Sequence, residues 1–391
     1  MELNESGSIA REIMLEFANS TGISFLGRPP RRYLWTDAFA VCNFLELFRL
    51  THDTEYRDLA LNLVDQVHHT LGRHRDDDLR RGWISGLDER EGALHPTRGG
   101  LRIGKQLNER RPGDPPNERL EWDRDGQYYH YMTKWMHALS RVSRVTGDPV
   151  YYRWALELAQ TAHATFTYIH PGDGRKRMYW KMSIDLSYPL VLAMGQHDPL
   201  DGLVTYSELQ AIASEDFSSR AWPGLSAGIA EMADICRGEK WATDDPLGIG
   251  SLLTDAWRMM QLVIMGGFND PVLLEAVLDS ALIGLHSFAG NNPLKYRARQ
   301  RLAFRELGLA IGLKAVAKLH RCIEANPHLF AREGYVQKSV ESLAGYLPLG
   351  EIIERFWLDD KNRQSGSWTE HREINMVMLA TSLAPDGLLF I

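Results

Sequence analysis

Aromatic side chains stand beside carboxylates or histidines at several places in this sequence. The clearest groups are Trp35–Asp37, Glu121–His130, Trp180 with Asp185, and Trp368–Glu373. The faces of indole rings stack on the C–H faces of pyranose rings, while carboxylates, guanidinium groups and amides hydrogen-bond to sugar hydroxyls. This combination of residue types indicates a site for a sugar.

Cleavage of a glycosidic bond requires two carboxyl groups, one protonated as the acid and one ionised as the base or nucleophile. The sequence offers Asp125 or Asp123 as one member of such a pair, and Glu306 or Glu373 as the other. The separation of the two carboxyl groups, which decides between retention and inversion, stays open at this point.

Further residues at the same helix starts are expected to bind the substrate. Asp37 and His371 would hold hydroxyl groups, and four tryptophans would stack on sugar rings. The full substrate-binding set is Trp35, Asp37, Trp122, Tyr129, His130, Trp180, Asp185, Arg305, Trp368 and His371. Structural roles compete with these assignments, since Asp37 and Asp125 could be first-turn acids of helices and Glu306 could form an ion pair with Arg305.

A repeated turn indicates the elements that position these side chains. Thr51–Tyr56 is matched 95 residues later by Thr146–Tyr151, and Gly267–Val272 is a weaker third copy. In each copy an apolar helix leads into a short polar turn with an aspartate, and a second helix follows with apolar residues at i, i+3, i+4 and i+7. The repeating unit is therefore predicted to be a helical hairpin.

Six segments are predicted to be well-buried helices, and six more are predicted to be amphipathic helices. The buried helices should start near Trp35, Gly126, Trp180, Gly248, Leu302 and His371. The amphipathic helices should span about 8–19, 54–72, 149–166, 204–217, 271–288 and 335–346. Helices that are apolar nearly all round belong inside, and amphipathic ones belong outside, which predicts an all-α toroid with inner and outer rings. Its last inner helix should pair with the N-terminal helix, and strands should be scarce.

The repeat favours a single domain over residues 1–391, although the length alone suggests two or three domains. The longest irregular stretch, about 82–124, contains Trp83 and Trp122 and balanced charge. We expect it to be a packed loop insertion that covers the mouth of the cavity.

Composition excludes several classes of protein. Lys and Arg number 44 against 51 Asp and Glu, a net charge of −7, which argues against a nucleic-acid partner or a polybasic membrane binder. The sequence has three scattered cysteines and no signal-peptide pattern, which favours a cytoplasmic protein. It also lacks a run of 18 uninterrupted apolar residues, so we expect no membrane span. No phosphate-binding loop, HExxH metal motif or nucleophile motif occurs in the sequence, so we expect no metal and no cofactor. The neighbouring histidines His68 and His69 fall in a predicted amphipathic helix, and we expect them on the surface. The sequence leaves open whether the protein forms a homo-oligomer.

The alternating inner and outer helices, together with the aromatic and acidic helix starts, resemble the six-hairpin (α/α)6-barrel superfamily. That superfamily includes many glycoside hydrolases and the N-acylglucosamine 2-epimerase-like enzymes. The groups Trp35–Asp37 and Trp122–Asp125 look like glycosidase helix starts. For the epimerase-like branch, the resemblance implies proton transfer by histidines on inner helices, for which His130 and His371 are the matching candidates.

Three functions follow as hypotheses. The first is a glycoside hydrolase that acts on a small oligosaccharide or glycoside through a pair of carboxylates. The second is a sugar epimerase or isomerase with His130 and His371 as the bases. The third is a non-catalytic binding module, or an enzyme for an apolar, isoprenoid-like substrate held in an aromatic pocket.

Overall fold

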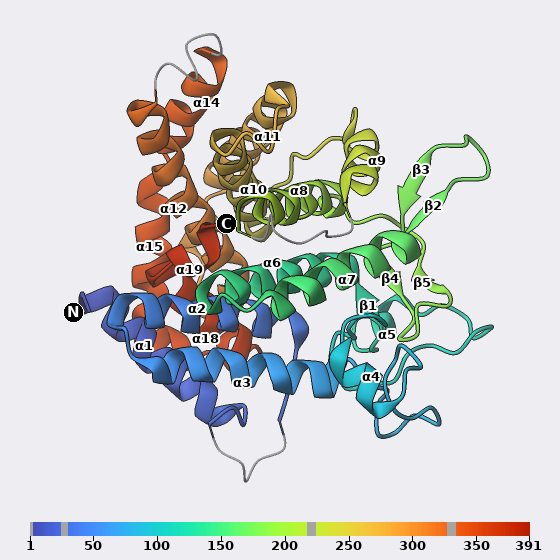
Figure 1. Cartoon of the computed structure of the whole chain (residues 1–391). Helices are drawn as coiled ribbons and strands as arrows, with labels where there is room; N and C mark the ends of the chain where they lie inside the picture. Colours follow the sequence, from blue (N-terminus) through green and yellow to red (C-terminus); the bar gives the residue numbers. More distant parts are fainter. Residues whose placement is uncertain (1–2, 25–29, 217–223, 327–333) are drawn as a thin grey trace. The chain divides into compact units, whose positions relative to one another are not determined.

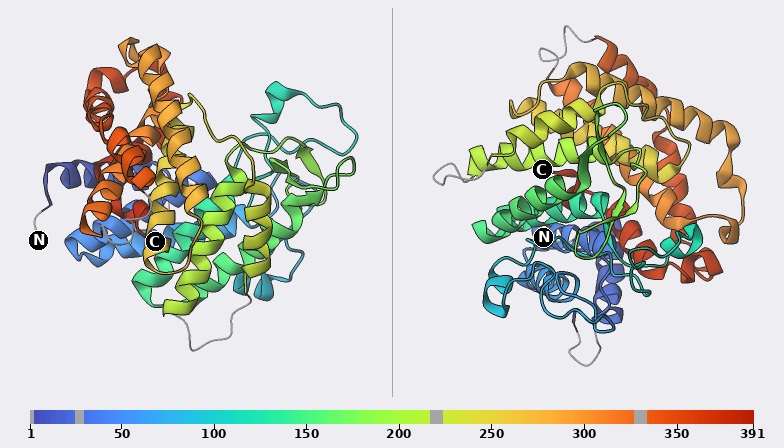
Figure 2. Two further views of the ribbon diagram at one scale, coloured as in Figure 1. Left: turned by 90° about the horizontal axis from the view of Figure 1, so that it is seen from above. Right: turned by 90° about the vertical axis from the view of Figure 1, so that its right-hand side faces the viewer.

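The computed structural model describes residues 3–24, 30–216, 224–326 and 334–391. The chain divides into two compact units, which are described separately here: unit 1 contains residues 1–17 and 238–391, and unit 2 contains residues 18–237. Figure 1 shows the helices of both units, and Figure 2 shows them from two further sides.

Unit 2 is built mainly from helical hairpins. Helix α2 packs against α3 and α6, and α6 also packs against α7 and α8 (Figure 1). Its longer helices are α2 (Leu34–Thr51), α3 (Thr54–Leu71), α6 (Tyr129–Thr146), α7 (Pro149–Phe166), α8 (Asp198–Asp216) and α9 (Ser226–Cys236).

The repeated turn that the sequence predicts is confirmed by identical hydrogen bonds in two hairpins. The Thr51 hydroxyl donates to the carbonyl of Leu47 and accepts from the backbone N–H of Asp53, whose side chain caps α3. Thr146 and Asp148 make the same contacts between α6 and α7. In the third copy, the side chain of Asp270 accepts from the Leu273 N–H at the start of α11. These caps satisfy backbone donors that a helix start leaves unpaired.

The predicted division into buried and amphipathic helices is confirmed in two hairpins, in which α2 and α6 are the buried helices and α3 and α7 are the amphipathic ones. Helix α2 is buried continuously from Leu34 to Leu47, whereas α3 buries one face with Tyr56, Leu63 and Val67. The third predicted inner helix is wrong in position, because residues after Trp180 form strands. Leu186 has a φ of 60° and Pro189 lacks an N–H, and both disfavour a helix there. The buried helix is instead α8, which was predicted to be amphipathic and to begin near residue 204.

Short antiparallel strands lie beside the start of α6. Strand β4 (Lys181–Met182) pairs with β1 (Gln127–Tyr128) on one side and β5 (Pro189–Val191) on the other, while β2 (Thr167–Ile169) and β3 (Lys176–Met178) form a separate hairpin. The register places Tyr128 opposite Lys181. The sheet therefore brings Trp180 next to the residues that open α6.

The long insertion of residues 82–124 contains two short helices, α4 (Glu89–Leu94) and α5 (Glu118–Glu121). Trp83 is buried together with Ile84, Leu101 and Ile103. Trp122, in contrast, is 54% exposed. The segment therefore buries apolar side chains at its beginning and middle, while its position over a cavity mouth stays a prediction.

Unit 1 carries most of its core between α10 (Pro246–Ile264) and α12 (Ala303–Ala325), which pack closely. A Cβ atom at Gly250 would lie 2.1 Å from the carbonyl oxygen of Gly308, so only glycine allows this approach. The side chain of Arg372 pairs with Glu16 of α1 (Glu5–Ser20). The remaining elements are α11 (Pro271–Asn291), η1 (Pro293–Lys295), η2 (Ala298–Gln300), α14 (Gly334–Ala344), α15 (Leu347–Leu358), α16 (Asp360–Arg363), α17 (Gly366–Thr369), α18 (Arg372–Leu383) and α19 (Asp386–Leu389).

Helix α11 is distinctive because its length and apolar composition alone would allow it to cross a membrane. The segment Pro271–Lys295 has a mean hydropathy of 1.5, and 39% of its apolar window is buried. Helix α11 packs against α10 and α14 through residues such as Leu274, Val277 and Leu285, which are all buried. Core helices of soluble proteins have the same length and composition, so this is weak evidence for a membrane span.

Candidate functional site

Six aromatic rings gather around the start of α6, in unit 2. We call Tyr33, Trp122, Tyr128, His130, Tyr131 and Trp180 the aromatic cluster. The His130 ring lies nearly parallel to Trp180 at a centroid distance of 6.5 Å, and Tyr128 is tilted against Trp180 at 5.1 Å. Trp122 meets Trp180 edge-on at 5.2 Å. Because Trp122 is exposed and Trp180 and His130 are partly exposed, the cluster offers rings to a ligand as well as to the core.

His130 faces a carboxylate within this cluster. Its Nδ1 lies 3.4 Å from Oδ1 of Asp198, and the His130 side chain is 28% exposed against 6% for Asp198. Oδ2 of Asp198 is buried and accepts no hydrogen bond from any described residue. Asp198 opens α8, which is held to α6 because Asp201 accepts from Thr133 and pairs with Lys134 at 2.8 Å. Nδ1 of His130 is likewise buried and has no hydrogen-bond partner among the described residues, so the two groups face one another without a hydrogen bond. A histidine beside a carboxylate is an arrangement suited to proton transfer, and such contacts tighten in many enzymes when substrate binds.

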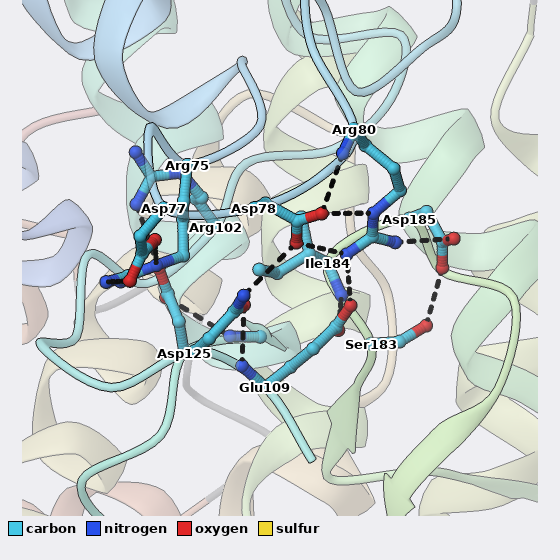
Figure 3. Close-up of polar contacts among 12 residues, drawn as sticks. Arg75, Asp77, Asp78, Arg80, Arg102, Glu109, Asp125, Ser183, Ile184 and Asp185 are labelled. Atoms are coloured by element: carbon cyan, nitrogen blue, oxygen red, sulfur yellow. Dashed lines mark hydrogen bonds and ion pairs between the residues drawn. The ribbon is translucent and has the colours of Figure 1, made fainter. Parts of the chain in front are cut away.

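Asp125 is fully buried, and described donors surround its carboxylate (Figure 3). Oδ2 accepts from Arg102 at 2.8 Å and from Arg75 at 3.3 Å. Oδ1 accepts from the backbone N–H groups of Gly104, Lys105 and Gly126. These contacts fix the loop before the aromatic cluster, and they leave Asp125 no exposed surface for a substrate.

A second ionic group, also drawn in Figure 3, centres on Arg80. Its guanidinium reaches Asp78 at 2.8 Å, Glu109 at 2.5 Å and Asp185 at 2.8 Å. Burial raises the pKa of Glu109, whereas the hydrogen bond from Arg80 holds the pKa of Asp78 well below its usual range. Asp185 therefore pairs with Arg80 rather than standing free for a sugar, and these contacts tie the insertion to the segment after β4.

Lys181 is buried beneath the cluster. Its Nζ donates to the carbonyl oxygens of Glu121 and Arg124 and lies 3.5 Å from Oε2 of Glu121. Burial lowers the pKa of Lys181 to about 8, and Glu121 opposes this shift. The lysine thus anchors the main chain on both sides of Trp122 and Asp123, and Asp123 itself is exposed.

Three other predicted residues of unit 2 lie in the core or at a helix start. Trp35 is 6% exposed and stacks on Phe39, and the Tyr129 hydroxyl donates to Tyr206 inside the protein. Asp37 accepts from the Tyr33 N–H at 2.9 Å and pairs with Arg32. The first-turn structural role, which the sequence left open for Asp37, is therefore present in the structure.

The predicted residues of unit 1 also have structural partners. Glu306 accepts from Arg301 through both carboxylate oxygens and from Nε1 of Trp357, so its ion pair is with Arg301 and not with Arg305. Arg305 instead pairs with Asp245 at 2.7 Å. Trp368 is buried and stacks on Trp357. His371 is exposed before α18, with its ring edge against Phe304, and Glu373 is partly exposed in the first turn of α18.

The structure places further residues in or beside the aromatic cluster that are absent from the predicted substrate-binding set, namely Tyr33, Lys105, Tyr128, Tyr131 and Asp198. A signal was available for Asp198, because Gln196–Asp198 directly precedes the apolar run of α8. His68 corrects another expectation, since it is buried and accepts from Nε1 of Trp135, while its neighbour His69 is exposed. Within the described ranges, no group of three or more His, Cys, Asp and Glu side chains could hold a metal ion.

No protein-family model and no curated protein matches the chain. Among solved structures, a GH76 α-mannanase of Bacteroides thetaiotaomicron has 10% identity and a TM-score of 0.56, covering 98% of this chain and 96% of that one. An inactive variant of an α-1,6-mannanase of Salegentibacter, in complex with α-1,6-mannotetrose, has 12% identity and a TM-score of 0.54, with 98% and 99% coverage. A cellobiose 2-epimerase from Spirochaeta thermophila has 13% identity and a TM-score of 0.48, with 95% and 97% coverage. The likeness to the two mannanases confirms the predicted fold class, an all-α (α/α)6 barrel.

Proposed function

We propose that this protein is a carbohydrate-active enzyme that binds its sugar against the aromatic cluster of unit 2. The observation that carries the proposal is a partly exposed histidine, His130, that lies among stacked rings and faces the buried carboxylate of Asp198. The rings suit the C–H faces of a sugar, and the imidazole of His130 is a group that can accept and return a proton. The shared fold with two α-mannanases supports the same class of substrate.

The finer proposal is a sugar epimerase or isomerase in which His130 is the base. Nε2 of His130 removes a proton from the carbon next to the carbonyl of an open-chain sugar, which leaves an enediolate. The same proton, or one exchanged with solvent, then returns from His130 to the neighbouring carbon on the same face of the enediolate, which completes an isomerisation without a redox partner. Epimerisation at the original carbon needs a second acid that gives a proton to the opposite face. Asp198 orients the ring and stabilises the imidazolium that forms between the two steps.

A glycoside hydrolase is the second candidate, and Asp123 favours it. This carboxylate is exposed beside Trp122, and no described residue hydrogen-bonds to it. Asp125 and Glu306 suit the hydrolytic roles less well, because each is buried and held by arginine. In this candidate, Asp123 is the carboxylate that acts beside a sugar stacked on Trp122.

A single incubation in D2O separates the two reactions. Sugars and short oligosaccharides would be incubated with the protein, followed by NMR for deuterium at a sugar carbon and by an assay for new reducing ends. Deuterium incorporation without cleavage is expected. It should fall at least a hundredfold in His130→Asn, because general base catalysis contributes about 10²–10⁴.

The matched control is His95→Asn, because His95 also pairs with a carboxylate, Glu157, at 2.6 Å, but lies outside the cluster. This variant should keep the wild-type rate. New reducing ends that disappear in Asp123→Asn would select the hydrolase. Full turnover of either kind in both His130→Asn and Asp123→Asn would contradict the proposed site.

A further inference from the structure

We infer that the sugar bound at the aromatic cluster is anionic, and that Lys105 pairs with its carboxylate or phosphate. This inference rests on the proposed function and adds the chemical class of the substrate. It starts from Lys105, whose ammonium lies over the Tyr33 ring at 5.3 Å from the centroid.

The main chain holds Lys105 in place from both sides. Its N–H donates to Oδ1 of Asp125 at 3.3 Å, and its carbonyl accepts from Nη1 of Arg75 at 2.5 Å. Gly104, just before it, has a φ of 94°, and a Cβ there would lie 2.2 Å from the carbonyl oxygen of Arg32. This turn therefore favours glycine at position 104, and in it the lysine side chain lies beside Tyr33.

The Lys105 side chain leads directly into the cluster. The Tyr33 hydroxyl lies 2.8 Å from the Tyr131 hydroxyl, and the Tyr131 ring packs edge-on against His130 at 4.9 Å. An anionic group on Lys105 would thus belong to a molecule that can also reach the rings around His130.

The surrounding cations differ from Lys105 in having carboxylate partners. Arg75 and Arg102 pair with Asp125, and Lys181 pairs with Glu121. Within the described ranges, no carboxylate forms an ion pair with Lys105, and its side chain is only partly exposed. A partly buried ammonium that has no carboxylate partner among the described residues is attractive to an anion, because charge-assisted contacts are stronger than neutral ones.

Binding of matched neutral and acidic sugars tests the inference. Calorimetry would compare glucose, galactose and mannose with glucuronate, galacturonate and mannuronate, and with glucose 6-phosphate and mannose 6-phosphate. At least one acidic sugar should bind about tenfold more tightly than its neutral partner, and its affinity should fall with rising salt. Comparison of the uronates with the sugar phosphates shows whether the site prefers a carboxylate or a phosphate.

The variants Lys105→Met and Lys105→Arg test whether Lys105 causes the preference for acidic over neutral sugars. Lys105→Met should remove the tenfold preference, and Lys105→Arg should keep most of it. Lys176→Met is the control, because Lys176 is a cation of the same unit that already pairs with Glu231. It should leave the preference unchanged.

Two results would overturn the inference in different ways. If neutral sugars bind as tightly as acidic ones in the wild type and in Lys105→Met, the anionic class is wrong but the sugar site stands. If no sugar of either kind binds, even in the wild type, the proposed function is overturned together with this inference. Circular dichroism of each variant would show that its fold is intact.

Discussion

The role of Asp125 gives the sharpest prediction, because sequence reasoning treated it as a catalytic carboxylate and the structure surrounds it with donors. Asp125→Asn keeps the shape of the side chain but replaces the ionised oxygen that Arg102 and Arg75 share. Removing one partner of a buried ion pair costs about 3–5 kcal/mol, because the other charge stays buried without compensation. Arg75 still has Asp77, and Arg102 still donates to the carbonyls of Arg73 and Thr70. We therefore expect the lower end, about 3 kcal/mol.

The assay is urea unfolding followed by tryptophan fluorescence at pH 7. Asp125→Asn should lower the midpoint without a change in the m-value. Asp123→Asn is the matched control, two residues away and exposed, and its free energy of unfolding should stay within about 0.5 kcal/mol of the wild type. If Asp125→Asn unfolds at the wild-type midpoint but loses all turnover, Asp125 is catalytic and the structural reasoning is refuted.

Three further predictions concern stability. Burial lowers the pKa of His68 to about 3, so protonation of the unfolded chain should reduce stability as the pH falls from about 6.5 towards 3, by at most about 5 kcal/mol. Unfolding of His68→Gln between pH 4 and 7 should show a weaker pH dependence, while the exposed neighbour variant His69→Gln should follow the wild type; equal slopes in all three would contradict this. Gly104→Ala should unfold more easily than Gly113→Ala in thermal melts, because both have a positive φ but only Gly104 meets a backbone oxygen, and an equal loss would show that the loop can shift. Glu306→Gln should destabilise the protein by about 3 kcal/mol in urea unfolding by leaving Arg301 buried without its partner, and wild-type stability would indicate that Glu306 is free to act on a substrate.

The helical hairpins could be predicted from the sequence because their signals are local. The threonine and aspartate of each turn bond to backbone groups within five residues, so Thr51–Tyr56 and Thr146–Tyr151 specify the same turn wherever they occur. The helix predicted near Trp180 failed because its short strands depend on pairing with β1, more than 50 residues earlier in the chain. Such a non-local pairing leaves no periodic pattern in the sequence.

The site could be predicted only in part, for a similar reason. Trp122, His130 and Trp180 are predicted as substrate-binding residues because aromatic and polar residues stand together in the chain, and the structure brings these three side chains into one cluster. The partners of Asp125 could not be found, because Arg75 and Arg102 lie 50 and 23 residues away from it. Sequence identifies a carboxylate near a helix start, whereas burial and partners decide whether it can act on a substrate.

A crystal structure with a bound sugar tests the central claim most directly. The ligand would be the tightest binder from the panel of neutral and acidic sugars, soaked into crystals of the wild-type protein. The proposal predicts a sugar ring stacked on Trp180 or Trp122, within hydrogen-bond reach of Nε2 of His130. A sugar that contacts none of the six residues of the aromatic cluster would contradict it.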